Sequence, residues 1–185
     1  MSDNKTIEPI VSHHQGNEKV KLTKNQKTHM IAIFMILLGF VVMNIQKVIK
    51  TSAIPSMSDQ FGLMLAIGVI TLILSILFIS FIYSLVVNFI SIELNVSYGV
   101  HVYYYLIATI VLQVLNTVIT PLISPTTHPV ILNIVGGAIT MLTVGTYCYM
   151  FVREKQLTKA EALKAGMIIV IGHFILTYGL GMFIS

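Results

Sequence analysis

Charged side chains are scarce in this sequence. Only 10% of its 185 residues are Asp, Glu, Lys or Arg, whereas 56% are hydrophobic. A soluble globular domain usually carries about 25% charged residues, which it needs to cover its surface. Apart from residues 153–164, the stretch from Asn95 to Ser185 contains none of these four residue types. This shortage of charge along apolar runs argues against an ordinary soluble domain and predicts a membrane protein.

Cysteine and the motifs of common enzymes are also scarce or missing. The one cysteine, Cys148, excludes an intrachain disulfide, and its apolar neighbours favour a packed side chain over a reactive thiol. No HExxH, GxSxG, phosphate-cradling glycine loop or aspartate-rich metal motif occurs. No Asp, Glu, Lys or Arg lies well inside an apolar run. We therefore expect no enzyme activity, no catalytic or metal-binding residues and no cofactor.

The long apolar runs predict an all-α fold, a bundle of five transmembrane helices within residues 29–185. A helix needs about 20 mostly apolar residues to cross the hydrocarbon, and a chain in lipid must satisfy its own peptide groups. Prolines in "TPLISPTTHP" end the third run. The second run exceeds one upright span, so a tilted helix or a break near Asn88 is expected. The predicted spans are 29–49, 61–90, 98–120, 130–152 and 163–184.

Lysine and arginine are concentrated in two polar segments. One is residues 1–28, which we interpret as a flexible tail with five Lys, and the other is the stretch 153–164. With the N-terminus in the cytoplasm, these segments place nine positive residues inside, leaving only Lys47 and Lys50 outside. The positive-inside rule favours this orientation, which puts the C-terminus outside and is consistent with a bacterial plasma membrane. Charge placed beside apolar runs indicates contact with membrane lipids and no binding to nucleic acid.

The loop after the fourth span contains a helix-start signal. Thr158 and Glu161 are spaced as a capping box, which predicts a helix that begins there and continues into the last span. The charges of this loop hold it in water. They also make it a candidate contact for a cytoplasmic partner or for lipid headgroups, through Arg153, Lys155, Lys159 and Lys164.

Polar residues inside the spans are candidate functional positions. His173 lies about one third of the way into the last span, and we expect it to be the most buried ionisable residue. A proton relay is one interpretation, but a lone histidine is more typical of hydrogen bonding between helices. Glu93 becomes the best candidate carboxylate if the second helix stays embedded that far. The complete set is Glu93, His101, Gln113, Asn116, Asn133 and His173.

Two further patterns concern helix packing. Gln113 and Asn116 are three residues apart, so they share a helix face and are expected to join the third helix to a neighbour. The run Tyr103–Tyr105 is interpreted as part of an aromatic belt at the membrane interface.

Over roughly residues 30–185, the chain resembles a known family. "VLQVLNTVITPLI" is followed by "ILNIVGGAITMLTVGTYCYMF", and "LTKAEALKAG" then leads into the last helix. This layout resembles that of the small bacterial members of the Yip1 family. Pro121 resembles the family's proline at the end of the third helix. The run before the family's last helix is matched by Leu157, Thr158 and Ala162. The resemblance implies a cytoplasmic tail, five spans and a very short C-terminal end. The Asp-Leu-Tyr-Gly-Pro stretch of eukaryotic members is absent, so binding of small GTPases is not implied.

These patterns favour a non-enzymatic integral membrane protein. It would act as a scaffold, assembly or envelope-homeostasis factor through helix packing and contact with lipids, a protein partner or a second copy. The alternative is a small transporter or permeation subunit for a neutral or apolar solute, lined by Asn116, Asn133 and His173. A further alternative is an immunity or accessory membrane protein for a secreted peptide.

Overall fold

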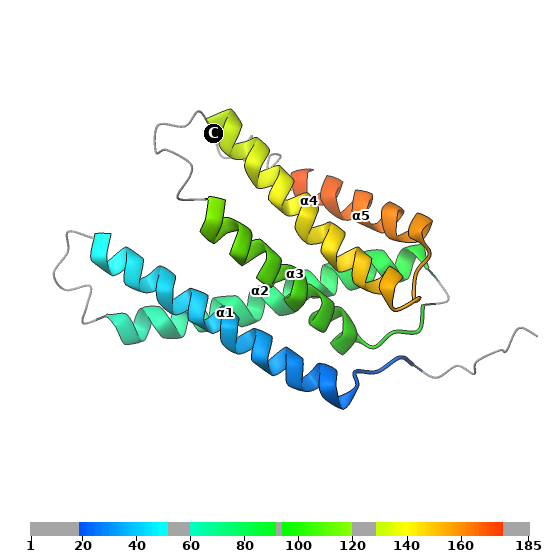
Figure 1. Cartoon of the computed structure of the whole chain (residues 1–185), viewed down its shortest axis with the longest axis horizontal. Coiled ribbons are helices and arrows are strands. Elements are labelled where there is room, and N and C mark those ends of the chain that lie inside the picture. Colours follow the sequence, from blue (N-terminus) through cyan, green and yellow to red (C-terminus); the bar gives the residue numbers. More distant parts are fainter. Residues whose placement is uncertain (1–18, 52–59, 92–93, 120–128, 176–185) are drawn as a thin grey trace, which may run out of the picture.

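Within the residues that the structure describes, all regular structure is α-helical (Figure 1). The structure is a computed structural model and describes residues 19–51, 60–91, 94–119 and 129–175. An isolated bridge between Val20 and Val96 is the one β-type pairing in these ranges. The predicted all-α class is confirmed. The helices are α1 (Lys24–Thr51), α2 (Phe61–Ile90), α3 (Tyr98–Ile119), α4 (Pro129–Arg153) and α5 (Lys159–Phe174).

The helix bounds follow the hydrophobic runs. The predicted spans 61–90, 98–120 and 130–152 agree with α2, α3 and α4 to within one residue at each end. α2 continues through Asn88 without a break. α1 begins at Lys24, ahead of the predicted start at 29, because Thr23 and Gln26 form a reciprocal pair of hydrogen bonds there, at 2.9 and 3.2 Å.

Four of the helices are long and apolar enough to cross a membrane. They are α1, α2, α3 and the part of α4 from Asn133 to Arg153. The chain is therefore a multi-pass membrane protein by the length and composition of its helices. α2 has 30 residues, which corresponds to about 45 Å of helix and exceeds a hydrocarbon core of about 30 Å unless the helix tilts. α5 has 16 residues, and the rest of the predicted span 163–184 lies outside the described residues after 175.

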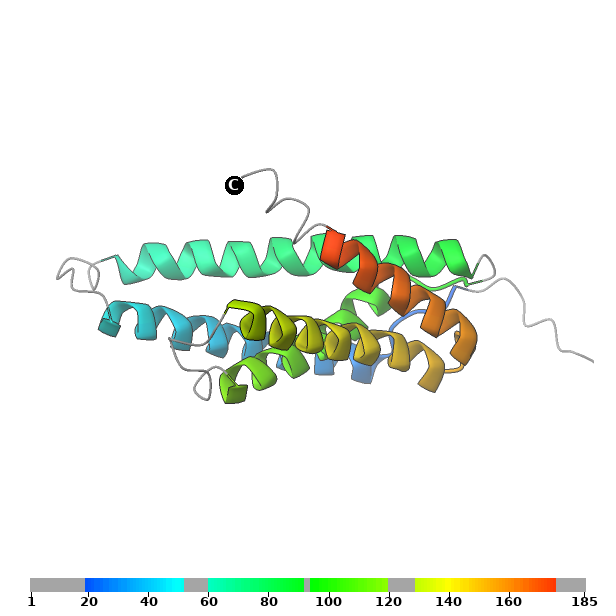
Figure 2. The same cartoon turned by 90° about the horizontal axis from the view of Figure 1, so that it is seen from above.

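The helices form two layers. α3 packs between α1 and α4 in one layer, while α2 and α5 contact each other in the second. α2 also packs on α1 and α3, and α5 packs on α4, so the second layer packs against the first (Figure 2). α2 and α3 therefore each contact three other helices, and α3, whose first half is mostly buried, is the central helix of the bundle.

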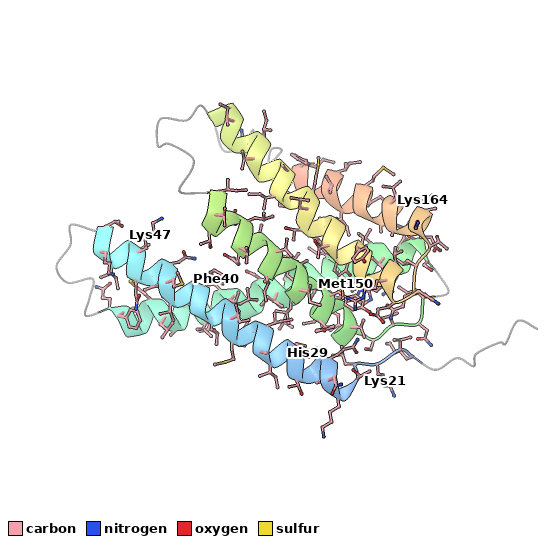
Figure 3. All side chains as sticks on the ribbon, viewed as in Figure 1. Lys21, His29, Phe40, Lys47, Met150 and Lys164 are labelled. Carbon is pink, nitrogen blue, oxygen red and sulfur yellow. The ribbon has the colours of Figure 1, made fainter. Side chains whose placement is uncertain are left out.

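Successive helices run in opposite directions along the bundle, so the connections between them lie at its two ends. At one end, here called the basic end, lie the start of α1, the α2–α3 connection and the α4–α5 loop (Figure 1). Lys21 and Lys164 lie at this end and Lys47 lies at the opposite, far end (Figure 3). The core is concentrated toward the basic end, in the second halves of α2 and α4 and the first half of α3. Its members include Val87, Val100, Tyr104, Ala108, Val144, Tyr147 and Phe151.

The outer faces of the helices are apolar. Phe89 is 81% exposed, and Phe78, Ile134 and Leu163 are each 65% exposed. Exposed apolar surface spread over several helices is unfavourable in water and indicates a lipid or protein environment. The outer faces therefore agree with the membrane placement that helix length and composition indicate.

Candidate functional site

A buried group of polar and aromatic side chains fills the core near the basic end. We call it the His101 cluster, and it consists of Tyr83 from α2, His101, Tyr104 and Tyr105 from α3, and Tyr147 and Phe151 from α4. None of these residues is more than 8% exposed. Because three helices contribute side chains, the cluster holds together the α2–α3 and α3–α4 contacts.

The spacing of these residues along their helices explains how they meet. On α3, His101, Tyr104 and Tyr105 are three and four residues apart, so they project from one side of the helix. On α4, Tyr147 and Phe151 are four residues apart and face α3. The ring of Tyr147 meets those of Phe151 and Tyr83 edge-on, with centroids 5.2 and 5.1 Å apart. Such edge-to-face pairs contribute about 0.5–1.5 kcal/mol each beyond the area they bury.

One hydrogen bond joins the polar atoms at the centre of the cluster. His101 Nδ1 lies 2.7 Å from the hydroxyl oxygen of Tyr147. His101 is 1% exposed and Tyr147 is 0% exposed, so water does not compete for this bond. The other ring nitrogen of His101, Nε2, is buried and makes no hydrogen bond to a described residue. His101 therefore links α3 to α4 through one nitrogen only.

A second polar contact joins α2 to the start of α3. Ser80 Oγ and the Tyr98 hydroxyl are 3.0 Å apart, and the same hydroxyl donates to the carbonyl oxygen of Leu77. Tyr98 also packs edge-on against Phe81, with ring centroids 6.5 Å apart. These contacts fix the depth at which α3 begins relative to α2.

The N-terminal segment is tied to the basic end by backbone hydrogen bonds. Val20 donates to the carbonyl oxygen of Asn95 at 2.8 Å, and its own carbonyl oxygen accepts from Ser97 at 2.9 Å. Leu22 follows and lies against Gly99, whose added Cβ would come within 3.2 Å of the leucine side chain. The chain between Val20 and α1 thus lies along the α2–α3 connection.

The loop between α4 and α5 is compact. Gln156 donates its backbone N–H to the carbonyl oxygen of Phe151 at 2.8 Å, and Lys155 has a positive φ of 54° that turns the chain. The predicted capping box is confirmed: Glu161 accepts from the Thr158 backbone N–H at 2.8 Å, and the Glu161 N–H donates to Thr158 Oγ1 at 3.2 Å. The hydrogen bonds from the Thr158 backbone and hydroxyl hold the pKa of Glu161 below its usual range.

The basic residues around this loop are exposed. Arg153, Lys155, Lys159 and Lys164 all project from the surface, as expected for a contact with lipid headgroups or a partner. Arg153 lies 3.9 Å from Glu154 in an exposed ion pair, which contributes little to stability in water. The fixed loop therefore presents its positive charges from a defined backbone.

An apolar groove of about 610 Å³ lies on the surface between α4 and α5. Its lining includes Val144, Cys148 and Ala162, which are buried, and Gly145 and Gly166. Lys159 lines it as well. A smaller apolar cavity of about 280 Å³ lies between α1, α2 and α3.

The structure separates the polar residues that the sequence groups together. His101 is in the core, whereas Asn133 and His173 lie on the surface of the bundle and Gln113 and Asn116 are half-buried. The prediction that His173 is the most buried ionisable residue is wrong, because its helix lies at the edge of the bundle, whereas His101 lies on the central helix. Glu93 falls outside the described residues.

The interpretation of Tyr103–Tyr105 as an interfacial belt is also wrong. The three side chains are 7%, 1% and 7% exposed and belong to the core. Belt residues face lipid, but the first half of α3, which carries these tyrosines, is mostly buried in the bundle. Cys148 is buried and unpaired, which confirms a packed side chain.

The partners of His101 could not be found from the sequence. Tyr147 and Phe151 are far from it along the chain, and only their four-residue spacing signalled a shared face. In the part of the chain that the structure describes, no three His, Cys, Asp or Glu side chains come together in a group that could hold a metal ion.

Comparisons with known proteins do not identify this chain. No family model, no curated protein and no solved structure matches it. The resemblance to the Yip1 family therefore stays a prediction.

Proposed function

We propose that this chain is a non-enzymatic scaffold or assembly protein of a bacterial plasma membrane, and that it binds a partner with an acidic surface at its basic end. The observation that carries the proposal is the construction of that end. The core, the backbone-tied segment at Val20 and the capped loop at Thr158 all meet there. A rigid, positively charged face of this kind suits recognition, because little ordering remains to be done on binding.

The proposed orientation places the basic end in the cytoplasm. The last of the five predicted spans, 163–184, then puts the C-terminus outside. The charge distribution supports this choice, since Lys47 and Lys50 are the two basic residues assigned to the exterior. Cysteine-accessibility labelling tests it in a Cys148→Ala background. Lys159→Cys should react with an impermeant maleimide only from the cytoplasmic side, and Lys47→Cys only from the exterior. The reverse pattern would exclude the proposed orientation.

Crosslinking in native membranes tests the scaffold role. The triple variant Lys155→Gln, Lys159→Gln, Lys164→Gln should lose a specific crosslinked partner, and the wild-type crosslink should weaken with increasing salt. The matched control carries Lys47→Gln and Lys50→Gln at the far end and should keep the partner. A crosslink that survives the triple variant, or that both variants lose equally, would contradict partner binding at the basic end.

Transport is the less favoured proposal. The three residues that would line a route are not buried in the bundle, since Asn133 and His173 are exposed and Asn116 is half-buried. Solute flux through reconstituted protein that is lost in both His173→Ala and Asn116→Ala would replace the scaffold proposal with a transport role. Turnover of a lipid or peptide by the purified protein would replace both.

A further inference from the structure

The groove between α4 and α5 has the form of a binding site for a long apolar chain. Its volume is about 610 Å³, within the range of about 300–1,000 Å³ that ligand sites occupy. Two glycines keep it open. A Cβ added at Gly145 would meet nothing within 4 Å, and one at Gly166 would meet only Cys148 Sγ at 3.7 Å and Val144 at 3.9 Å.

The length of the groove matches one leaflet of a bilayer. Its lining on α5 extends from Lys159 to Ile171, which corresponds to about 18 Å at the helical rise of 1.5 Å per residue. Half of a hydrocarbon core measures roughly 15 Å. An acyl chain of the leaflet that adjoins the basic end would therefore extend along most of the groove.

Charge at one end of the groove selects the headgroup. Lys159 is the one charged residue among the described residues that line it. It stands in the first turn of α5, beside the loop that carries Lys155 and that follows Arg153, the last residue of α4. The carboxylates of Glu154 and Glu161 stay charged nearby, but they are outnumbered: the stretch 153–164 carries four Lys or Arg against two Glu, a net charge of +2. The mouth of the groove is therefore suited to a negative group.

From these features we infer that the groove binds an anionic glycerophospholipid, with one acyl chain between α4 and α5 and the phosphate at Lys159. A second copy of the chain fits less well. Two copies in one membrane share their orientation, so a symmetric dimer through this groove would place both Lys159 ammonium groups at the same depth near the interface. Like charges brought together in this way oppose association.

This inference goes beyond the scaffold role. It rests on the proposed placement of the basic end at the membrane surface, but it needs no protein partner. The test therefore uses the purified full-length chain alone in phosphatidylcholine vesicles, so that failure to find a partner in native membranes leaves its result unaffected.

Photolabelling with lipid probes tests the headgroup. The vesicles contain traces of phosphatidylglycerol or phosphatidylcholine with a diazirine in the acyl chain, and labelled peptides are mapped by mass spectrometry. We expect phosphatidylglycerol to label the groove near Met141, Cys148 and Met167 several-fold more than phosphatidylcholine does. Lys159→Gln should abolish this excess. Lys164→Gln, which removes an exposed lysine of the same helix outside the groove, should preserve it.

A steric variant tests the acyl chain. Gly145→Leu should reduce groove labelling by both probes several-fold, because the new side chain occupies open space in the groove. Gly136→Leu is the matched control, since its Cβ also meets nothing within 4 Å and it does not line the groove. Circular dichroism and size-exclusion chromatography check that both variants are folded.

Three results would overturn the inference. The first is equal labelling by the two probes, and the second is an equal effect of Lys159→Gln and Lys164→Gln. The third is groove labelling that Gly145→Leu leaves unchanged. A Gly145→Leu variant that changes the oligomeric state, in a protein that shows no preference for phosphatidylglycerol, would assign the groove to a second copy.

Discussion

Replacing Tyr147 by Phe removes one hydroxyl from the centre of the His101 cluster and leaves the aromatic ring in place. His101 Nδ1 then loses its partner at 2.7 Å, while Nε2 already has none among the described residues. A buried polar group without a partner costs about 1–3 kcal/mol. In membrane proteins, hydrogen bonds between helices measured by double-mutant cycles average about 0.6 kcal/mol and reach about 1.7.

The burial of this pair places it near the upper end of that range. His101 and Tyr147 are 1% and 0% exposed, and the ring of Phe151 lies 5.0 Å from that of His101, between centroids. We therefore expect Tyr147→Phe to lower the free energy of unfolding by about 1–2 kcal/mol. We expect a coupling of about 1–1.5 kcal/mol in the cycle with His101→Leu, since the double variant leaves neither partner unpaired.

Reversible unfolding in mixed dodecylmaltoside and SDS micelles, followed by circular dichroism, measures these energies. Tyr149→Phe is the matched control, because Tyr149 is two residues away on the same helix and is 61% exposed. It should change stability by no more than about 0.5 kcal/mol. A coupling below about 0.3 kcal/mol is within ordinary additivity and would refute the claim that this hydrogen bond joins α3 to α4.

Three further predictions concern the loop and the helix contacts. Thr158→Ala removes the N-cap of α5 and should weaken its first turn by about 1 kcal/mol. This corresponds to roughly fivefold more local opening, which amide hydrogen exchange of residues 160–163 would measure. Unchanged exchange would contradict the role of the cap. Because the pKa of Glu161 is lowered in the fold, its contribution is present above the ordinary carboxyl pKa and lost as the pH falls through the lowered value. The protection of this turn against hydrogen exchange should therefore fall in acid, and Glu161→Gln should remove this dependence on pH. Gly68→Ile should destabilise the α1–α2 contact by about 1–3 kcal/mol, since its Cβ would lie 2.9 Å from Val41 Cγ1, whereas Gly62→Ile enters open space and should not.

The sequence predicted the helices better than it predicted their partners. The bounds of α2, α3 and α4 followed from where apolar runs stop, which is a local property that the bilayer enforces. The capping box at Thr158 was also local, because both of its members lie within four residues. The hydrogen-bonded pair Thr23 and Gln26 is equally local. It places the start of α1 within the stretch that its polarity had assigned to the tail.

Burial in the bundle could not be predicted in this way. His101 and His173 are both single histidines in apolar helices, and their sequence surroundings do not distinguish them. Their difference arises because α3 is enclosed by α1, α2 and α4, whereas α5 is at the edge. The same cause converted Tyr103–Tyr105 from an expected belt into core residues. In a membrane both faces of a helix are apolar, so hydrophobic periodicity carries little information about which face is inside.

The uneven distribution of the core has a mechanical consequence. In the described helices, the interlocked aromatic rings of the core lie in the half of the bundle toward residues 24, 90 and 153, while the opposite half contains few buried residues. Lateral compression of the bilayer would therefore deform one leaflet's share of the protein more than the other's. When membrane tension changes, the cross-section of the protein would therefore change first in the half toward the far end, while the half toward the basic end would keep its shape.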